Sequence, residues 1–344
     1  MLKPFYYASD ADCTALDGLV VGIIGYGGQG RAFAANLRDS GVAVRIGNIA
    51  DAYRDSAVAD GHTVLDIETA VLGADIVVLL IPDDAHKQVF DTAIAPVIRP
   101  GSTLIVAHGH SLSHGEVVPV AGVDLAMLAP RMYGDPIRAY YLAGAGAPAY
   151  LDIVADATGK ALARVLAVAD AVGFTRAGVM PLDHRQETIL DLFQEQFVAP
   201  ALVDLVETSF RVLVERGFDP RAALLEVYGS GEIGKMMLDG AAIGLDEVIR
   251  TQGSPACQVG YHLYRDRLLP EALTARAHEI LTGIENGPFA ALMSTEAAAG
   301  YPLLAAARRA GDARALTRVH HEVRAAFRFP GDKADRLYAA GGDA

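Results

Sequence analysis

Three acidic side chains recur at four-residue steps in the segment QETILDLFQEQ, residues 186–196. If the segment is helical, Glu187, Asp191 and Glu195 share one stripe of its surface. Like charges at this spacing weaken a solvated helix by about 0.2–0.5 kcal/mol per pair, so the stripe needs a compensating partner. Carboxylates can share divalent cations, and Mg²⁺ prefers oxygen ligands. The alternative is a solvated helix face whose acids pair with Arg or Lys.

Further oxygen ligands lie downstream, in the segments LLEVYGSGEIGK and TQGSPACQVGYH. The first segment contributes Glu226 and Glu232, and the second contributes Ser254. A two-metal site holds its ions roughly 3.5–4 Å apart, bridged by carboxylate. These residues are therefore candidates for the same site as the acidic stripe.

The stretch LVVGIIGYGGQGRAFAANLRDSG predicts a dinucleotide-binding loop. Residues 20–24 form a continuous apolar run, typical of a strand buried on both faces, and residues 31–37 continue with helical periodicity. The glycines between them have G-x-G-x-x-G spacing, which allows a tight turn, close approach of a pyrophosphate and close helix–strand packing. The helix N-terminus also attracts phosphate. We therefore expect cofactor contacts from Gly25, Tyr26, Gly27, Gly28, Gln29 and Gly30.

The loop GNIADAYRDS, after the second predicted strand, bears on the choice between NADH and NADPH. An acid there binds a ribose 2′-hydroxyl, whereas an Arg accommodates a 2′-phosphate. Asp51 and Asp55 would repel a phosphate, while Arg54 and Ser56 could bind one. The sequence favours NADH and leaves NADPH open. Cofactor contacts are expected from Asn48, Asp51, Arg54 and Ser56.

A parallel sheet would position these residues. Apolar strand-like runs alternate with helix-like segments: strands at 20–24, 42–48, 74–82, 102–109 and 123–130, helices at 50–60, 66–72 and 84–94. This rhythm predicts an α/β fold with a doubly wound parallel sheet of the Rossmann type. Ligands bind beyond the carboxyl ends of such strands, so Pro82, His108 and Pro130 should line the crevice, with Pro82 and His108 near the cofactor.

After Pro181, which could be a hinge, the pattern becomes helical. Long amphipathic patterns cover residues 184–216, 220–239, 255–284 and 312–328. We therefore expect a dinucleotide-binding domain at residues 1–182 and an all-α domain at residues 183–344 that carries the acids.

Composition limits the classes of partner. The chain has 344 residues, of which 52% are hydrophobic and 21% charged, typical of a soluble two-domain protein. A net charge of −13 argues against nucleic acid or an anionic membrane as the main partner. Cys13 and Cys257 make neither a disulfide framework nor a zinc site. There is no apolar run of the ~20 residues that span a bilayer, nor a signal-peptide core, so we expect a cytoplasmic protein.

Four blocks of the chain resemble the ketol-acid reductoisomerases of branched-chain amino-acid synthesis, and the likeness runs over roughly residues 15–285. The blocks are VGIIGYGGQGRAFAANLRDSGVAVRIG, IAPVIRPGSTLIVAHGHSL, DATGKALARVLAVADAVGFTRAGV and ETILDLFQEQ. The last is similar to the family's metal helix, Glu-Thr-x-x-Asp-Leu-Phe-Gly-Glu-Gln, which is a highly specific motif.

The resemblance implies an NAD(P)H- and Mg²⁺-dependent conversion of 2-acetolactate to 2,3-dihydroxy-3-methylbutanoate. An alkyl group of the 2-hydroxy-3-oxo acid migrates, and hydride then reduces the new 2-keto acid. The resemblance also implies a homodimer or higher homo-oligomer with shared active sites, in which Glu226 comes from the partner subunit. The implied metal ligands are Asp191, Glu195 and Glu226, and the implied catalytic residues are His108, Arg131, Glu195, Glu226 and Ser254.

The chain departs from the family pattern at three positions. Arg131 stands where the family has a catalytic lysine, so a cation is kept but cannot donate a proton. Ser230 replaces an acid expected four residues after Glu226; Glu232 lies two residues further, about 200° around a continuous helix. Gln258 replaces a glutamate of the serine segment. Loss of acids should affect the alkyl migration more than the reduction.

These departures leave two alternatives to a reductoisomerase. One is a divergent reductase of a 2-keto acid or imine in another pathway, without isomerisation. The other is a nucleotide-binding homologue without turnover, against which the presence of His108, Asp191 and Glu195 argues. Turnover of 2-acetolactate, compared with its rearranged 2-keto acid, separates the three.

Overall fold

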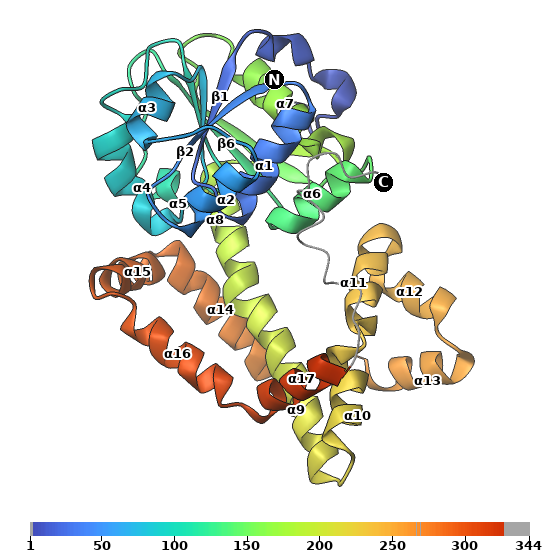
Figure 1. Cartoon of the computed structure of the whole chain (residues 1–344). Helices are drawn as coiled ribbons and strands as arrows, with labels where there is room; N and C mark the ends of the chain where they lie inside the picture. The colour runs from blue at the N-terminus through green and yellow to red at the C-terminus, as the bar shows by residue number, and fades with distance from the viewer. Residues whose placement is uncertain (1–2, 266, 269, 327–344) are drawn as a thin grey trace. The chain divides into compact units, whose positions relative to one another are not determined.

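The chain divides into two compact units within helix α8, His184–Phe193 (Figure 1). The computed structural model describes residues 3–265, 267–268 and 270–326. The first unit runs to Leu190 and the second begins at Asp191. The division thus falls a short way beyond the domain boundary at 182/183 that the sequence predicts.

In its described residues, the first unit contains an eight-stranded sheet with the order β3-β2-β1-β4-β5-β6-β7-β8. Neighbouring strands from β3 to β6 pair in parallel, so the expected α/β Rossmann-type sheet is confirmed. Strand β7 differs, because it pairs antiparallel with β6. The strands are β1 Val20–Ile24, β2 Ala43–Gly47, β3 Val64–Leu65, β4 Ile76–Leu79, β5 Thr103–Val106, β6 Asp124–Pro130, β7 Ala149–Ala155 and β8 Val179–Pro181.

Helices flank the sheet of the first unit (Figure 1). Those at 52–59, 67–72 and 83–89 lie close to the expected positions, and the last continues as a π-helical turn, Phe90–Ile94. Short 3-10 turns lie at Ala8–Asp10, Cys13–Leu16 and Phe174–Arg176. The helices are α1 Gly28–Asp39, α2 Ala52–Ala59, α3 Ile67–Leu72, α4 Asp83–Val89, α5 His110–Ser113, α6 Gly134–Leu142 and α7 Ala161–Val172.

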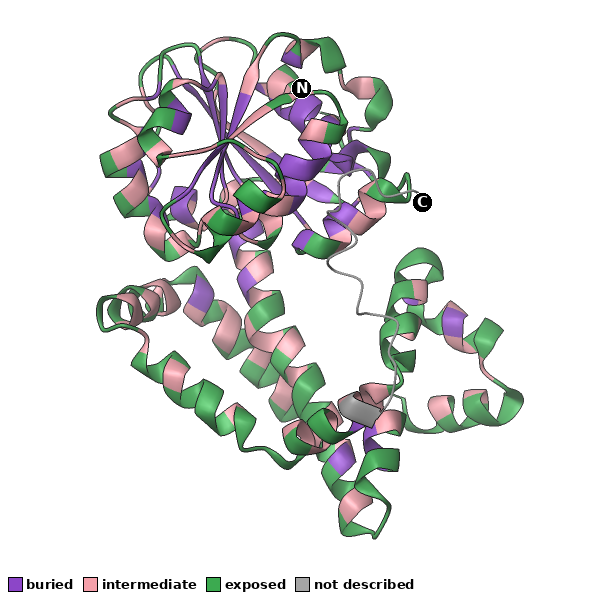
Figure 2. Ribbon diagram, in the orientation of Figure 1, coloured by how far each residue is buried: buried purple, intermediate pink, exposed green. Residues whose placement is uncertain are grey.

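The apolar strands build two cores, one on each face of the sheet. Ile76 and Val78 of β4 pack into one cluster of buried residues, whereas Val77 and Leu79 pack into the other. Successive side chains of a strand point to opposite faces, which explains why an unbroken apolar run is needed there. Figure 2 shows the buried residues concentrated in the strands and in the inward sides of the helices.

The second unit is helical in its described residues, as expected, but its helices are shorter than the sequence pattern suggests. Two π-helical turns, Gln194–Val198 and Leu225–Gly229, interrupt the regular hydrogen bonding. The helices after α8 are α9 Ala199–Glu215, α10 Pro220–Leu224, α11 Glu232–Ile243, α12 Leu245–Gln252, α13 Pro255–Tyr264, α14 Glu271–Glu285, α15 Pro288–Ala298, α16 Pro302–Asp312 and α17 Ala315–Ala326.

The expectation that Glu226 and Glu232 share one continuous helix is wrong. Glu226 lies in the π-helical turn, and Glu232 begins α11. Gly231, between them, has a φ of 83°, a left-handed conformation that ends the preceding helix. The angle between the two acids therefore does not follow from helical periodicity.

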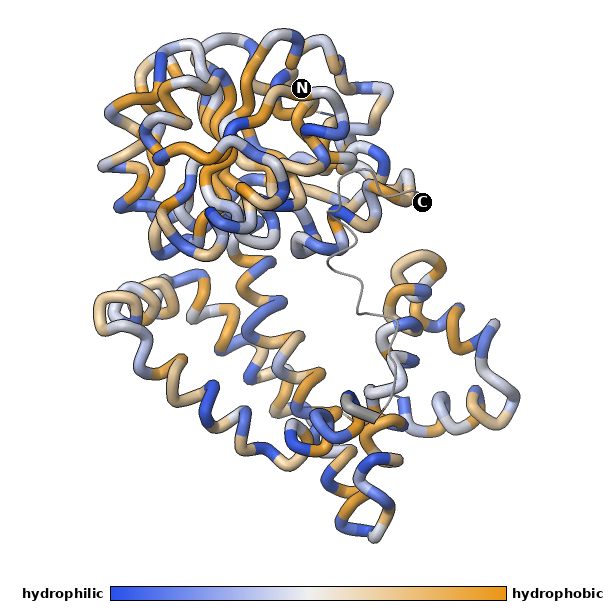
Figure 3. The backbone as a smooth tube through the Cα atoms, in the orientation of Figure 1, coloured by the Kyte–Doolittle hydropathy of each residue, from blue (hydrophilic) through white to orange (hydrophobic). Residues whose placement is uncertain are grey.

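The second unit buries little of its apolar surface. Its buried cluster consists of Phe210, Ala223, Leu224 and Val323, with partly buried neighbours. Figure 2 shows mostly exposed residues along its helices, and Figure 3 shows that many of these segments are hydrophobic. Among the described residues, no helix has both the length and the apolar character that a membrane crossing requires.

Candidate active site

The glycine-rich loop joins β1 to α1 in the form that a pyrophosphate requires. A Cβ atom on Gly25 would lie 2.6 Å from the carbonyl oxygen of Leu80, and one on Gly30 would lie 2.1 Å from that of Gly25. A Cβ on Gly27 or Gly28 would meet nothing within 4 Å. The first and third glycines of the motif are therefore needed for packing, while the second leaves the α1 N-terminus open to a ligand.

Tyr26 and Asn48 support this loop from within the protein. The Tyr26 side chain is buried, and its hydroxyl donates to Asp60 Oδ2 at 2.8 Å, an oxygen that Arg31 Nε also contacts at 2.7 Å. Burial, with the neighbouring Asp60 carboxylate, raises the pKa of Tyr26. Tyr26 N donates to Asn48 Oδ1 at 3.0 Å. Of the expected cofactor residues, these two thus hold the loop in shape with their side chains.

The residues expected to choose between NADH and NADPH lie at the start of α2. Asp51 caps this helix, and the bonds from Asn48, Tyr53 and Arg54 all reach its Oδ1. The Arg54 guanidinium donates to the carbonyl oxygen of Asn48 at 2.9 Å, and Ser56 Oγ donates to that of Ala52 at 3.0 Å. Both groups that could bind a 2′-phosphate are therefore engaged with their own backbone.

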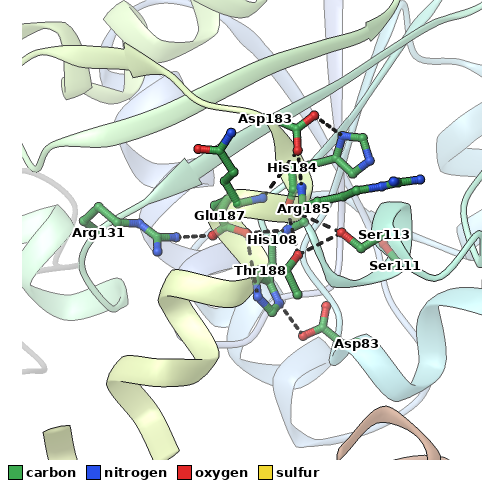
Figure 4. Close-up of polar contacts among 12 residues, drawn as sticks. Asp83, His108, Ser111, Ser113, Arg131, Asp183, His184, Arg185, Glu187 and Thr188 are labelled. Atoms are coloured by element: carbon green, nitrogen blue, oxygen red, sulfur yellow. Dashed lines mark hydrogen bonds and ion pairs between the residues drawn. The ribbon is translucent and has the colours of Figure 1, made fainter. Parts of the chain in front are cut away.

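His108 lies just beyond β5, beside Asp83 at the start of α4 (Figure 4). His108 Nδ1 is 2.9 Å from Asp83 Oδ2, because β4 and β5 are parallel neighbours whose carboxyl ends meet. Burial works against the charged form of Asp83, but the hydrogen bond from His108 and the neighbouring histidines outweigh it, so the pKa of Asp83 lies below its ordinary value. Asp83 was not predicted from the sequence as a site residue.

Glu187 of α8 is fully buried and bonded through both carboxylate oxygens (Figure 4). Oε2 accepts from Gly109 N at 2.7 Å, and Oε1 accepts from Arg131 Nη2 at 2.5 Å. His108 Nε2 lies 3.8 Å from Glu187 Oε2. The Arg131 guanidinium also lies over the Tyr150 ring, 4.9 Å from its centroid. A protein cation therefore neutralises the first acid of the stripe, and Arg131 is a fixed positive charge at the end of β6.

His108, Glu187 and Asp191 each offer one ligand atom, and these atoms lie within 4.8 Å of one another. Mg²⁺ takes oxygen ligands, and both oxygens of Glu187 already accept hydrogen bonds. Asp191 is the carboxylate of this group that the sequence predicts as a Mg²⁺ ligand. Glu195 follows one turn later, exposed, in the π-helical turn at 194–198.

A second group of possible metal ligands consists of Asp152, Asp183 and His184. Hydrogen bonds at the start of α8 account for their closeness. The backbone N and Nδ1 of His184 lie 3.0 and 2.8 Å from Asp152 Oδ2. Asp183 Oδ1 accepts from Arg185 N at 2.9 Å. These bonds join α8 to β7 and hold Glu187 in place.

Glu226 and Ser254, also expected in the site, lie exposed in the second unit. Ser254 caps α13 by accepting from Cys257 N, and Gln258 Nε2 donates to the carbonyl oxygen of Gly253 at 2.9 Å. Of the predicted catalytic residues, the structure thus brings His108 and Arg131 together around Glu187. The fourfold spacing of the stripe was the sequence signal for Glu187; an acid beside a proline gave no such signal for Asp83.

Comparison with known families identifies the chain. Residues 15–178 match the family model for the acetohydroxy acid isomeroreductase NADPH-binding domain, and residues 184–329 match that for the ketol-acid reductoisomerase C-terminal domain. This chain belongs to the ketol-acid reductoisomerase family. It is an NAD(P)H-dependent oxidoreductase of the ketol-acid reductoisomerase type, which supports the first of the three alternatives that the sequence left open.

Solved structures agree with this membership. An NADH-preferring ketol-acid reductoisomerase from an uncultured archean is 30% identical, with a TM-score of 0.89 over 95% of this chain and 100% of that chain. A semialdehyde dehydrogenase NAD-binding protein from Cupriavidus necator is 20% identical, with a TM-score of 0.59 over 78% of this chain and 99% of that one. A 1-pyrroline-5-carboxylate reductase from Streptococcus pyogenes is 17% identical, with a TM-score of 0.51 over 78% and 98%. The last two share the fold alone.

Proposed function

We propose that this ketol-acid reductoisomerase converts 2-acetolactate to 2,3-dihydroxy-3-methylbutanoate in branched-chain amino-acid synthesis in the cytoplasm. The observation that carries the proposal is the cluster around buried Glu187, which gathers His108, Arg131 and Asp191. His108 and Arg131 follow β5 and β6, at the edge of the sheet where doubly wound folds bind their ligands.

Each residue of this cluster has a role in the proposed reaction. Both the alkyl migration and the reduction develop negative charge on a substrate oxygen, which a fixed cation such as Arg131 stabilises. His108 exchanges protons with the substrate through its imidazole, which fits general acid–base chemistry near neutral pH. When bound, Mg²⁺ polarises the substrate carbonyl as a Lewis acid, and the nicotinamide supplies the hydride. Asp191 and Glu195, with Glu226, are the carboxylates that would hold Mg²⁺.

NADH is the proposed cofactor, in preference to NADPH. All bonds that the described residues make to the Asp51 carboxylate reach Oδ1, which leaves Oδ2 to accept from a ribose 2′-hydroxyl. Arg54 is tied to the backbone of Asn48, so it would have to break that bond to meet a 2′-phosphate. The relative with an NADH preference supports the same choice, whereas the family model for the first domain names NADPH.

We also propose a homodimer, or a higher homo-oligomer, with shared active sites. The second unit exposes many apolar side chains, among them Leu238, Val259 and Leu263. A large amount of exposed apolar surface is typical of an interface. A two-fold interface would give each active site the Glu226 and Ser254 of the partner chain.

The test is turnover of two substrates by the purified protein with Mg²⁺ and either nicotinamide cofactor. We expect 2,3-dihydroxy-3-methylbutanoate from 2-acetolactate and, faster, from 3-hydroxy-3-methyl-2-oxobutanoate, because Ser230 replaces an acid needed mainly for the migration. We also expect a higher kcat/KM with NADH. Product from the second substrate alone would show a reductase without isomerisation, and a higher kcat/KM with NADPH would overturn the cofactor proposal.

A further inference from the structure

Each ring nitrogen of His108 lies beside a carboxylate. Asp83 Oδ2 lies 2.9 Å from Nδ1. An ionised carboxylate only accepts hydrogen bonds, so Nδ1 carries a proton in this pair. Nε2 then lies on the opposite side of the ring, 3.8 Å from Glu187 Oε2. Asp83 and Glu187 thus flank the imidazole, one at each nitrogen.

The helix turn that carries Asp83 is itself held in place by a second histidine, His86, which lies one turn further along α4. His86 is buried, and its Nε2 lies 3.1 Å from the carbonyl oxygen of Ile81. Because a carbonyl only accepts, Nε2 carries the proton, and Nδ1 can accept from Ser111 Oγ at 2.9 Å. Burial lowers the pKa of His86, in keeping with a neutral ring. His86 therefore ties the first turn of α4 to the segment after His108.

The ring of His108 is restrained from its face as well as from its edge. His110 stacks against it, with 6.0 Å between centroids and 22° between planes. His108 is 18% exposed and Asp83 38%, so the bond between them is only partly open to water. The neighbouring acid, Asp84, is exposed on the same turn of α4 and makes a matched control.

We propose that Asp83 is a positioning residue, which keeps a proton on Nδ1 of His108 and holds Nε2 on the side of the ring that faces Glu187. The proposal rests on the proposed function only in taking His108 as the reacting imidazole. An amide at position 83 would keep the size of the carboxylate but could donate to Nδ1, which would move the ring proton to Nε2. Partners that orient a metal-bound histidine typically contribute about 10–100-fold to activity, and we expect an effect of the same order here.

The kinetic test compares Asp83→Asn, Asp83→Glu and Asp84→Asn. We expect Asp83→Asn to lower kcat by about 10–100-fold while the KM for the nicotinamide cofactor stays within about twofold. Asp83→Glu should recover part of the lost kcat, because it restores an acceptor, and Asp84→Asn should match the unmodified enzyme. An unchanged kcat in Asp83→Asn, or equal losses in Asp83→Asn and Asp84→Asn, would overturn the proposal.

A spectroscopic test needs no turnover, so it separates this proposal from the proposed function. Histidine-selective ¹⁵N NMR of the full chain, with His108→Gln to assign the resonances, reports which nitrogen is protonated. We expect a proton on Nδ1 in the unmodified protein and a shift toward Nε2 in Asp83→Asn. A proton on Nε2 alone in the unmodified protein would overturn the proposal, even if Asp83→Asn fails to fold.

Discussion

The two units differ in how far each completes its own core. In the first, strands such as β4 are buried throughout, and alternate side chains supply two cores. In the second, Leu238, Val259 and Leu263 are 58%, 69% and 51% exposed. Burial of apolar surface is the dominant favourable term in folding. A single chain therefore supports the first unit well, whereas the second has apolar surface that a second copy could cover.

The same difference extends to the charged residues. Glu187 is buried and paired with Arg131 inside the first unit, so that its place is fixed by its own chain. Glu226, in contrast, is an exposed acid on an interrupted helix. We infer that one half of the active site is preformed and that the other depends on assembly.

The variant with the largest expected effect tests whether an ion pair holds the first unit's half of the active site in place. Arg131→Met leaves the fully buried Glu187 without its cation. Removing one partner of a buried pair typically costs about 3–5 kcal/mol of unfolding free energy. We expect a loss of about 3 kcal/mol, measured by chemical denaturation.

A double-mutant cycle separates this ion pair from general damage. Arg131→Met with Glu187→Gln removes both charges, so we expect part of the lost stability to return. Arg185→Met, an exposed arginine on the same helix as Glu187, should change the unfolding free energy by less than about 0.5 kcal/mol. No loss in Arg131→Met would show that Glu187 is held in place by other contacts.

A smaller effect tests whether the acids at the start of the second unit bind metal. Mg²⁺ that binds only the folded protein raises its stability, by about 2.7 kcal/mol at 100 times the dissociation constant. We expect Mg²⁺ to raise the melting temperature of the unmodified protein, and Asp191→Asn to remove most of that gain. Asp204→Asn, at an exposed position on α9, should keep it. A melting temperature that does not change when Mg²⁺ is added would exclude the proposed metal site.

Local patterns predicted the first half of the fold well, because buried parallel strands and a glycine loop leave clear signals. The sequence did not reveal β3, of two residues, or β7, whose half-buried positions break the apolar run. The breaks in the second unit were missed because a π-helical turn has the same composition as an α-helix. Glycines such as Gly231 and Gly244 were local signs of breaks there, since a positive φ ends a helix.

The active-site contacts were harder to predict than the residues themselves. His108 and Arg131 were recognised from the family resemblance, but their partners lie 25 and 56 residues away in sequence. Only the order of strands brings Asp83 to His108 and α8 to the end of β6. The sequence alone treated the acidic stripe as one unit, and it did not show that Glu187 is buried and paired with a protein cation.

The dependence of the active site on a second chain can be measured directly by mixing two inactive variants. Asp191→Ala and Glu226→Ala should each abolish conversion of 2-acetolactate. If the sites are shared, random exchange of subunits makes about half of the dimers heterodimers. Each heterodimer has one intact site of its two, so the mixture should show about a quarter of the unmodified activity. That recovery is the expected result. No recovery, with exchange of subunits demonstrated by mass spectrometry, would place each active site within a single chain and contradict the account.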